Sequence, residues 1–256
     1  MSWAGRRRAI IIAIATLLAL AALAILFFSI FYKVPTCTDR KQNQGEAGVD
    51  CGGECQRLCP FQVSSPPAVR FVRVLSPQSG RTDVIAYVDN PNLDAEAKGA
   101  PFLLEVYDAN QQRLAQKTVK VDLPASMTVP VYLPDVARGE EAAQAFLTPV
   151  PEDIVWTKAQ NRLTLPTTEQ IVVVEGERPR VTATLVNPLA KPFYDTTLVA
   201  TIFDVEGNVI AASQTLVPTL PSQGTVSLVF TWNAPFSVST PRVEILPVPK
   251  VGSRAP

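Results

Sequence analysis

The sequence contains no histidine. Histidine is the commonest general base and the commonest metal ligand, so its absence removes every histidine-dependent nucleophilic triad and many enzyme classes. The chain also lacks a net charge, because 23 basic residues balance 23 acidic ones. Residues 1–33 hold four of these bases and no acid, which leaves 19 basic against 23 acidic side chains in residues 34–256. That remainder lacks the basic footprint of a nucleic-acid-binding protein, and we predict no enzyme, no nucleic-acid partner and no small-molecule substrate.

Runs with a strong helical pattern are scarce after residue 33, whereas the 23 prolines and many Val, Leu and Thr residues are spread along the chain. This composition is typical of short strands joined by turns. A chain of 256 residues has room for two modest domains. We therefore predict a mainly β protein after its N-terminal segment.

Residues 9–32 form an uncharged apolar run of 24 residues. As a helix the run rises about 36 Å, enough to cross a hydrocarbon core of roughly 30 Å with some tilt. A signal peptide has a shorter apolar region and a small-x-small cleavage site, and Phe31-Tyr32-Lys33 offers no such site. Arg6-Arg7-Arg8 precede the run and favour a cytoplasmic N-terminus. The prediction is a cytoplasmic segment 1–8, a single-pass transmembrane helix 9–32 in the lipid bilayer of the cell membrane, and extracellular domains after it.

All the cysteines lie in a predicted module of residues 33–63, at Cys37, Cys51, Cys55 and Cys59. An extracellular location favours two disulfides, because so short a segment cannot bury a sufficient core. A zinc site is the alternative, but zinc modules commonly use two closely spaced pairs, whereas thirteen, three and three residues separate these cysteines. Four cysteines allow three pairings, and the sequence does not choose among them.

The module resembles a recurrent cysteine-rich motif of bacterial secreted and surface proteins, C-x-D-G, then N, then E, then V-D-C-G-G-x-C and a final cysteine. The matching positions are Cys37, Asp39, Asn43, Glu46, Val49, Asp50, Cys51, Gly52, Gly53, Cys55 and Cys59. Arg40 stands where the motif has glycine, and three residues separate the last two cysteines.

Four side chains of this module supply hard oxygen atoms, and they are candidate calcium ligands: Asp39, Asn43, Glu46 and Asp50. The alternative is that these side chains cap turns and face solvent, as Asp and Asn commonly do. No EF-hand spacing is present. Calcium is the one cofactor that the sequence suggests.

The rest of the chain contains two similar stretches about 97 residues apart. Val84–Pro91 aligns with Val181–Pro188, and Leu104–Asp108 aligns with Ala200–Asp204. Leu-Pro pairs at residues 123–124 and 220–221 follow, each with an alternating strand after it. So long a period is that of a whole domain, and we predict an internal repeat.

Each copy alternates apolar and polar residues between turns, which favours antiparallel strands in an immunoglobulin-like β-sandwich. The order V-x-N-P, aromatic-Asp turn, L-P and strand resembles FxLYD-type immunoglobulin-like domains of bacterial envelope proteins. We predict sandwiches at residues 64–155 and 156–250, joined within Pro149–Gln160 as a semi-rigid tandem, and a tail at residues 251–256 that frays from Pro247. Asp108 and Asp204 are expected to build hairpins, and Trp156 and Trp232 to pack in or beside the cores.

These features predict a non-enzymatic, membrane-anchored extracellular protein of the bacterial cell envelope, with a structural or interaction role and protein or other envelope partners. A calcium-dependent surface adhesin is the first alternative. An envelope enzyme without histidine is the second, and it would need Ser-Lys, paired carboxylates or metal-bound carboxylates. Uncovered sheet edges also allow association between copies.

Overall fold

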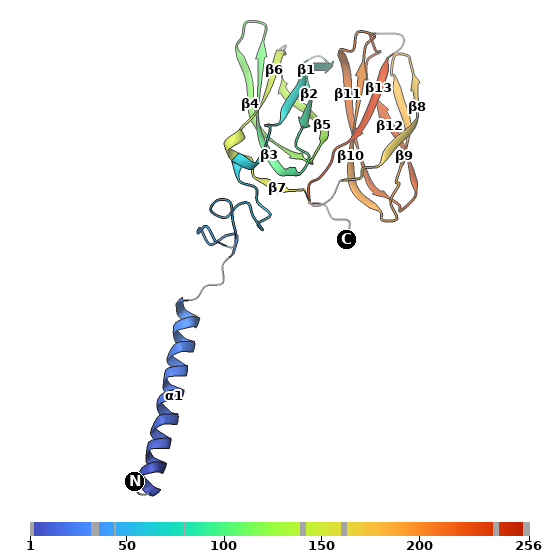
Figure 1. Cartoon of the computed structure of the whole chain (residues 1–256). Helices are drawn as coiled ribbons and strands as arrows, with labels where there is room; N and C mark the ends of the chain where they lie inside the picture. Colours follow the sequence, from blue (N-terminus) through green and yellow to red (C-terminus); the bar gives the residue numbers. More distant parts are fainter. Residues whose placement is uncertain are drawn as a thin grey trace. The chain divides into compact units, whose positions relative to one another are not determined.

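The computed structural model describes residues 3–31, 36–43, 45–78, 80–138, 142–159, 163–237 and 241–252. It divides into two compact units, Met1–Cys55 and Gln56–Pro256. The first unit contains the helix α1, Trp3–Phe31, and the N-terminal part of the cysteine module (Figure 1). The second unit is built from antiparallel strands. The predicted fold class, mainly β after one apolar helix and a small disulfide-bonded module, is confirmed.

Helix α1 is apolar along its length, with a mean hydropathy of 3.0 over Gly5–Ser29 and no part of that window buried in the protein. Such a helix fits a membrane span or a signal sequence. The helix begins at Trp3, earlier than the predicted start at residue 9, and therefore includes Arg6, Arg7 and Arg8. Tyr32, the last residue of the predicted span, lies outside the described residues.

The first sandwich has a sheet of order β1-β2-β5 facing a sheet of order β4-β3-β6. Their bounds are β1 Ala68–Gln78, β2 Arg81–Asn90, β3 Ala95–Asp108, β4 Arg113–Leu123, β5 Met127–Arg138 and β6 Ala142–Pro149. Inward-facing apolar residues from both sheets form one core, centred on Val84, Phe102, Leu104 and Leu123. Alternation along β3, with Phe102, Leu104 and Val106 buried, produces this core face.

The second sandwich has the same strand order, with sheets β8-β9-β12 and β11-β10-β13 (Figure 1). Their bounds are β8 Thr167–Val174, β9 Arg180–Val186, β10 Phe193–Phe203, β11 Val209–Leu220, β12 Thr225–Thr231 and β13 Arg242–Pro247. Leu185, Leu198, Ile202 and Phe230 are among the most buried side chains of its core. Trp156 and Trp232 belong to the first and second cores respectively, as predicted.

A buried asparagine fixes the same turn in each sandwich. The Asn90 Nδ2 donates to the carbonyl oxygens of Ala95, Leu123 and Pro124 at 2.8–3.2 Å. In the other sandwich Asn187 Nδ2 donates to the carbonyls of Lys191 and Pro221, each at 2.8 Å. Each side chain thus satisfies buried backbone groups that the strands leave unpaired. The asparagine of the V-x-N-P pattern is therefore a structural residue in both copies.

Asp108 and Asp204 cap the hairpins that follow β3 and β10. Each Oδ1 accepts two backbone N–H groups, from Asn110 and Gln112 in the first hairpin and from Glu206 and Asn208 in the second. Hydrogen bonds of this kind build turns at Asp residues. The predicted hairpin role of both aspartates is confirmed.

The first sandwich extends beyond the predicted boundary at residue 155. Two short 3₁₀ turns belong to this unit, η1 at Pro60–Gln62 and η2 at Pro151–Asp153. Strand β7, Trp156–Lys158, follows η2 and pairs with the start of β3. Arg57 also bridges to Thr157, so residues 56–58, expected in the cysteine module, add to the same edge. The domain boundary falls later because Trp156 completes the first core.

The segment from Pro247 to Gly252 is not frayed, in contrast to the prediction. Val248 N donates to Thr197 O at 2.8 Å, and Val251 N donates to Asp122 Oδ2 at 2.8 Å. Val251 is buried. The buried Val251 and the half-buried Val248 hold the segment along both sandwiches. The remaining predicted tail, residues 253–256, lies outside the described residues.

Candidate functional sites: the cysteine module and the sandwich junction

The cysteine module is closed by disulfides. All four cysteines are disulfide-bonded, and one bond joins Cys37 to Cys55 with the Cα atoms 5.7 Å apart. The disulfide prediction is therefore confirmed, and the thiolates that the zinc alternative requires are absent from the oxidised chain. Cys55 and Cys59 are fully buried, so cysteine side chains form the buried interior of this short segment.

Several residues of the module adopt left-handed backbone conformations that its tight turns require. Arg40, which replaces the glycine of the motif, has φ +61°. Gly53 has φ +58°, and a Cβ placed there would lie 2.1 Å from the carbonyl oxygen of Gly45. A side chain at residue 53 is therefore excluded by contact, whereas Arg40 adopts a conformation that is costly for any residue except glycine.

The four candidate calcium ligands lie in one hydrogen-bonded network. Asn43 Nδ2 donates to Asp39 Oδ2 at 2.8 Å, and the Lys41 N–H donates to Asp39 Oδ1. These two hydrogen bonds, that of Asn43 first, lower the pKa of the Asp39 carboxyl. Glu46 Oε2 accepts the N–H groups of Asn43 and Asp50 at 3.2 and 3.3 Å.

The Asp50 carboxylate accepts the Arg40 N–H at 3.0 Å. Together, these contacts are those of turn caps, the alternative that the sequence left open. One atom of the network differs: Asn43 Oδ1 is buried and has no hydrogen-bond partner among the described atoms.

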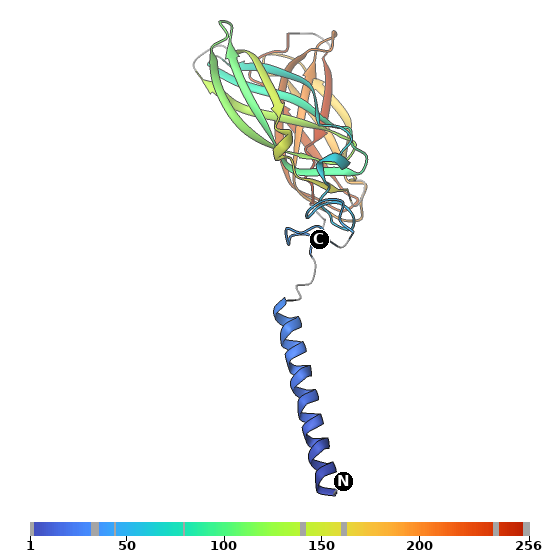
Figure 2. The ribbon, with the colours of Figure 1, turned by 60° about the vertical axis from the view of Figure 1, so that its left-hand side comes forward.

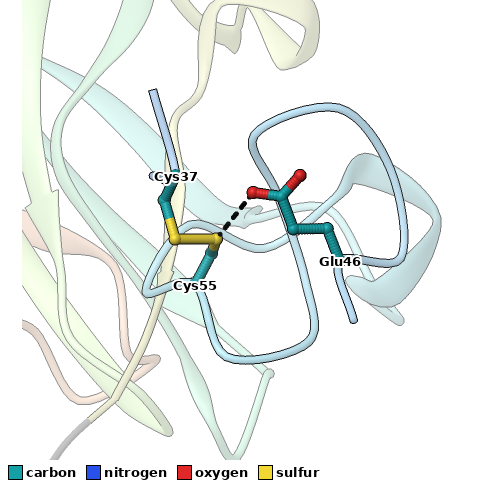
Figure 3. Close-up of side chains that lie close together, drawn as sticks. All are labelled: Cys37, Glu46 and Cys55. Carbon is teal, nitrogen blue, oxygen red and sulfur yellow. Dashed lines mark hydrogen bonds between the residues drawn. A yellow bond between two sulfur atoms is a disulfide. The ribbon is translucent and has the colours of Figure 1, made fainter. Parts of the chain in front are cut away.

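Only one group of three potential metal ligands within 4.8 Å of one another occurs in the described residues: Cys37, Glu46 and Cys55 (Figure 3). Two of its three members are sulfurs of the disulfide, which do not bind metals as thiolates do. Glu46 Oε1 lies 3.1 Å from Cys55 Sγ, a close oxygen–sulfur contact in which the disulfide sulfur carries no proton to donate. Asp39 and Asp50 are not in this group, and the calcium prediction stays a prediction.

The two sandwiches are joined by a third apolar cluster, which sequence analysis missed. The outer face of the β1-β2-β5 sheet packs on the outer face of the β11-β10-β13 sheet (Figures 1 and 2). The cluster contains the buried residues Leu75, Ile85, Tyr87, Val199, Phe203 and Ala212. A junction with its own apolar core makes the second unit one packed body.

Polar groups of this junction are also paired across it. Tyr87 Oη donates to Thr201 Oγ1 at 3.0 Å and contacts Glu244 Oε2 at 3.2 Å. Burial, and next the nearby Glu244 carboxylate, raise the pKa of Tyr87 well above its ordinary value, although the bond to Thr201 opposes this. The Arg242 guanidinium stacks 3.8 Å from the ring centre of Phe203. The junction therefore combines an apolar cluster with specific hydrogen bonds between the two sandwiches.

A cavity of about 320 Å³ opens beside the junction. Its lining includes Arg81, Asp83 and Tyr132 from the first sandwich and Trp232 from the second. Asp83 is only 1% exposed, and its carboxylate accepts hydrogen bonds from Arg81, Tyr132 and the Asp135 N–H. Because the buried carboxylate is ion-paired with Arg81 and hydrogen-bonded on both oxygens, this cluster fixes the bulge between β2 and β5 rather than presenting reactive groups.

Comparisons with known proteins assign no family to the chain. No family model matches the sequence, and no curated protein matches it. A red sea bream transglutaminase is 16% identical over 72% of this chain, with a TM-score of 0.26, and the chain spans only 29% of that enzyme. The tandem CBM22 domains of Paenibacillus barcinonensis Xyn10C are 10% identical over 71% of this chain and 86% of their own length, with a TM-score of 0.15. Likenesses this weak carry no functional argument.

Proposed function

We propose that this chain is a non-enzymatic, membrane-anchored protein of the bacterial cell envelope, with its cysteine module and immunoglobulin-like sandwich pair outside the cell. Its role is structural or is to bind other envelope proteins. The observation that carries the proposal is the succession of an unburied apolar helix, a disulfide-bonded module and a packed pair of sandwiches along one chain.

The helix supports the anchor because its apolar surface is not buried by any of the described residues. Its apolar window is unburied, and bulky side chains such as Leu17, Leu18 and Ile25 are more than 60% exposed. So long an apolar surface is stable only in lipid or against another apolar body. The three arginines at its start favour retention of that end in the cytoplasm.

The disulfides support an extracellular location for the rest of the chain. Disulfides persist in oxidising compartments and are rare in the cytosol, where thiols are kept reduced. The Cys37–Cys55 bond also shortens the covalent path from the helix. Residues 32–37 extend at most about 22 Å, whereas residues 32–55 without the bond could extend about 86 Å. The oxidised module thus acts as a short tether between the anchor and Cys55.

A binding or structural role is supported by how the polar residues of the sandwiches are used. Asp108 and Asp204 cap hairpins, and Asp83 is bonded on both oxygens. Asn90 and Asn187 satisfy buried backbone groups. These groups build turns and strand ends, whereas a catalytic site needs polar groups that remain available for a substrate.

Labelling of the full chain in bacterial spheroplasts tests the topology. Val205 is 79% exposed in a hairpin, so a V205C variant is expected to react with a membrane-impermeant maleimide in intact spheroplasts. An S2C variant is expected to react only after the membrane is permeabilised. The reverse pattern, or a labelled product that is released from the membrane in soluble form, would contradict the anchored extracellular arrangement.

A calcium-dependent adhesin is a second candidate, because Asn43 Oδ1 is buried and has no hydrogen-bond partner among the described residues, while Asn43 is bonded to the carboxylates of Asp39 and Glu46 through its other polar groups. An amide oxygen is a suitable calcium ligand. Native mass spectrometry of the chain with and without calcium separates the two candidates. The scaffold proposal predicts no stoichiometric adduct, and the adhesin predicts one calcium ion that an N43L variant loses.

A further inference from the structure

The junction inside the second unit joins two different sheets of two similarly built sandwiches. The first sandwich uses the outer face of β1-β2-β5, and the second uses the outer face of β11-β10-β13. In strand order, β1-β2-β5 corresponds to β8-β9-β12, and β4-β3-β6 corresponds to β11-β10-β13. The junction is therefore heterologous: each sandwich contributes the face that the other leaves unused.

Among the described residues, two sheet faces of complementary kinds consequently take no part in the junction. We define the trailing face as the outer side of β8-β9-β12, and the leading face as the outer side of β4-β3-β6. The trailing face is the counterpart of the surface that the first sandwich uses at the junction. The leading face is the counterpart of the surface that the second sandwich uses there.

The trailing face carries β-branched side chains at its centre. Val172, Thr182 and Val229 lie in one cross-strand row, and the two valines are 53% and 54% exposed. Thr182 and Val229 occupy the positions that Ile85 and Tyr132 occupy in the first sandwich, at an offset of 97 residues.

The leading face carries exposed aromatic surface at the matching place. Tyr107 packs edge-to-face on Phe146 at 5.9 Å, and Phe146 is 51% exposed. Tyr107 pairs with Arg113 and Gln144 just as Phe203, its counterpart in the junction, pairs with Val209 and Arg242. An aromatic side chain thus stands at the same point of the face in both sandwiches.

We propose that the trailing face of one chain packs on the leading face of a second copy, and so repeats between chains the sheet-on-sheet contact already present within each chain. The correspondence of these two faces, in strand order, with the two faces of the internal junction selects a second copy as the occupant. A heterologous contact does not use up both faces, so repetition yields a linear array of sandwiches rather than a closed dimer.

The contact between chains is weaker than the internal junction, because threonines replace Ile85 and Tyr87 at its centre. It therefore depends on concentration. The proposal concerns the sandwiches alone, but membrane anchoring, where the proposed function holds, would confine the chains to a surface and raise their effective concentration.

Complementation between two blocked variants tests this arrangement in the full chain. V229K places a charge on the trailing face, and F146K places one on the leading face. V205K, which alters a hairpin residue 79% exposed, is the matched control. Circular dichroism and thermal unfolding establish that all three variants retain the fold. Sedimentation velocity in detergent, up to about 1 mM chain, measures the oligomers.

The wild-type chain and V205K are expected to form a ladder of oligomers that lengthens with concentration. V229K alone and F146K alone are expected to be monomeric, whereas an equal mixture of the two forms dimers and nothing larger. Three results would overturn the proposal: a monomeric wild-type chain throughout, a ladder that neither variant changes, or a variant that still dimerises with itself, which indicates an isologous contact.

Discussion

Strands β2 and β9 occupy equivalent places in the two sandwiches but have different surroundings. In β2 every residue from Thr82 to Val88 is buried, because Val84, Ala86 and Val88 face the first core while Ile85 and Tyr87 face the junction. In β9 burial alternates, and Thr182 and Thr184 lie on the open face. The two sandwiches thus share a fold but differ in the side chains of one outer face. These side chains decide whether that face packs against a neighbouring sandwich or remains exposed.

The largest difference in unfolding free energy between the two sandwiches is expected when a side chain is truncated at equivalent positions of β2 and β9. Ile85 is fully buried, so I85A should lower the free energy of unfolding by about 2–5 kcal/mol. T182A, on the open face of β9, should change it by less than about 0.5 kcal/mol. Urea unfolding of the full chain followed by tryptophan fluorescence measures both, since Trp156 and Trp232 lie in different cores. Equal losses would contradict the assignment of Ile85 to a junction that Thr182 lacks.

Loss of the turn asparagine should instead destabilise both sandwiches. N90A and N187A each leave buried carbonyl groups without a donor, and we expect each to cost about 1–3 kcal/mol. The effect of N90A should be larger, because Asn90 Nδ2 has three acceptors and Asn187 Nδ2 has two. The same urea unfolding assay measures both variants. A large loss in only one would show that the two turns are not equivalent.

The junction should be sensitive to alkaline pH. Burial raises the pKa of Tyr87 and of Tyr132, and for Tyr132 the neighbouring Asp83 carboxylate adds to the shift. Their neutral forms are favoured in the folded state, so this stability is fully present below the unfolded tyrosine pKa of about 10 and is lost as the pH rises above it.

Unfolding midpoints measured from pH 8 to 11.5 should therefore fall above pH 10. Y87F should make that fall less steep, because phenylalanine has no proton to lose. An identical pH dependence in Y87F and the wild-type chain would remove Tyr87 from this account.

The smallest expected effect lies in the cysteine module. Arg40 has φ +61°, so R40G should relieve the left-handed conformation and stabilise the module by about 0.5 kcal/mol after the entropy cost of glycine. K41G, at an exposed neighbour without positive φ, should have the opposite sign. Amide hydrogen exchange of residues 36–55, followed by mass spectrometry, resolves the two. Slower exchange in K41G than in R40G would be inconsistent with strain at Arg40.

The features predicted correctly are those that local sequence determines. Alternation along strands such as β3 gave the β class, and the clustered cysteines gave the disulfide module. The Asp-x-x-Gly and related turns placed Asp108 and Asp204 at hairpins. Each of these depends on residues close together in the chain, where spacing and residue type are enough.

The features missed depend on contacts between distant segments. Strand β7 joins the first sandwich because it pairs with residues 95–97 of β3, and Val251 is held by Asp122. The junction had one local signal, the uninterrupted apolar run Val84–Val88, since a strand covered on both faces loses its alternation. Which surface covers the second face is a property of the folded pair, and no pattern within the run states it.

The most direct test of the anchored, oxidised arrangement is the intact mass of the full chain extracted from bacterial membranes and alkylated without reductant. The anchored, oxidised arrangement predicts that the N-terminal helix is retained, that the mass is lower by four hydrogens than that of the reduced chain, and that no alkyl group is added. Four alkylated thiols, or a chain cleaved after the helix, would contradict it.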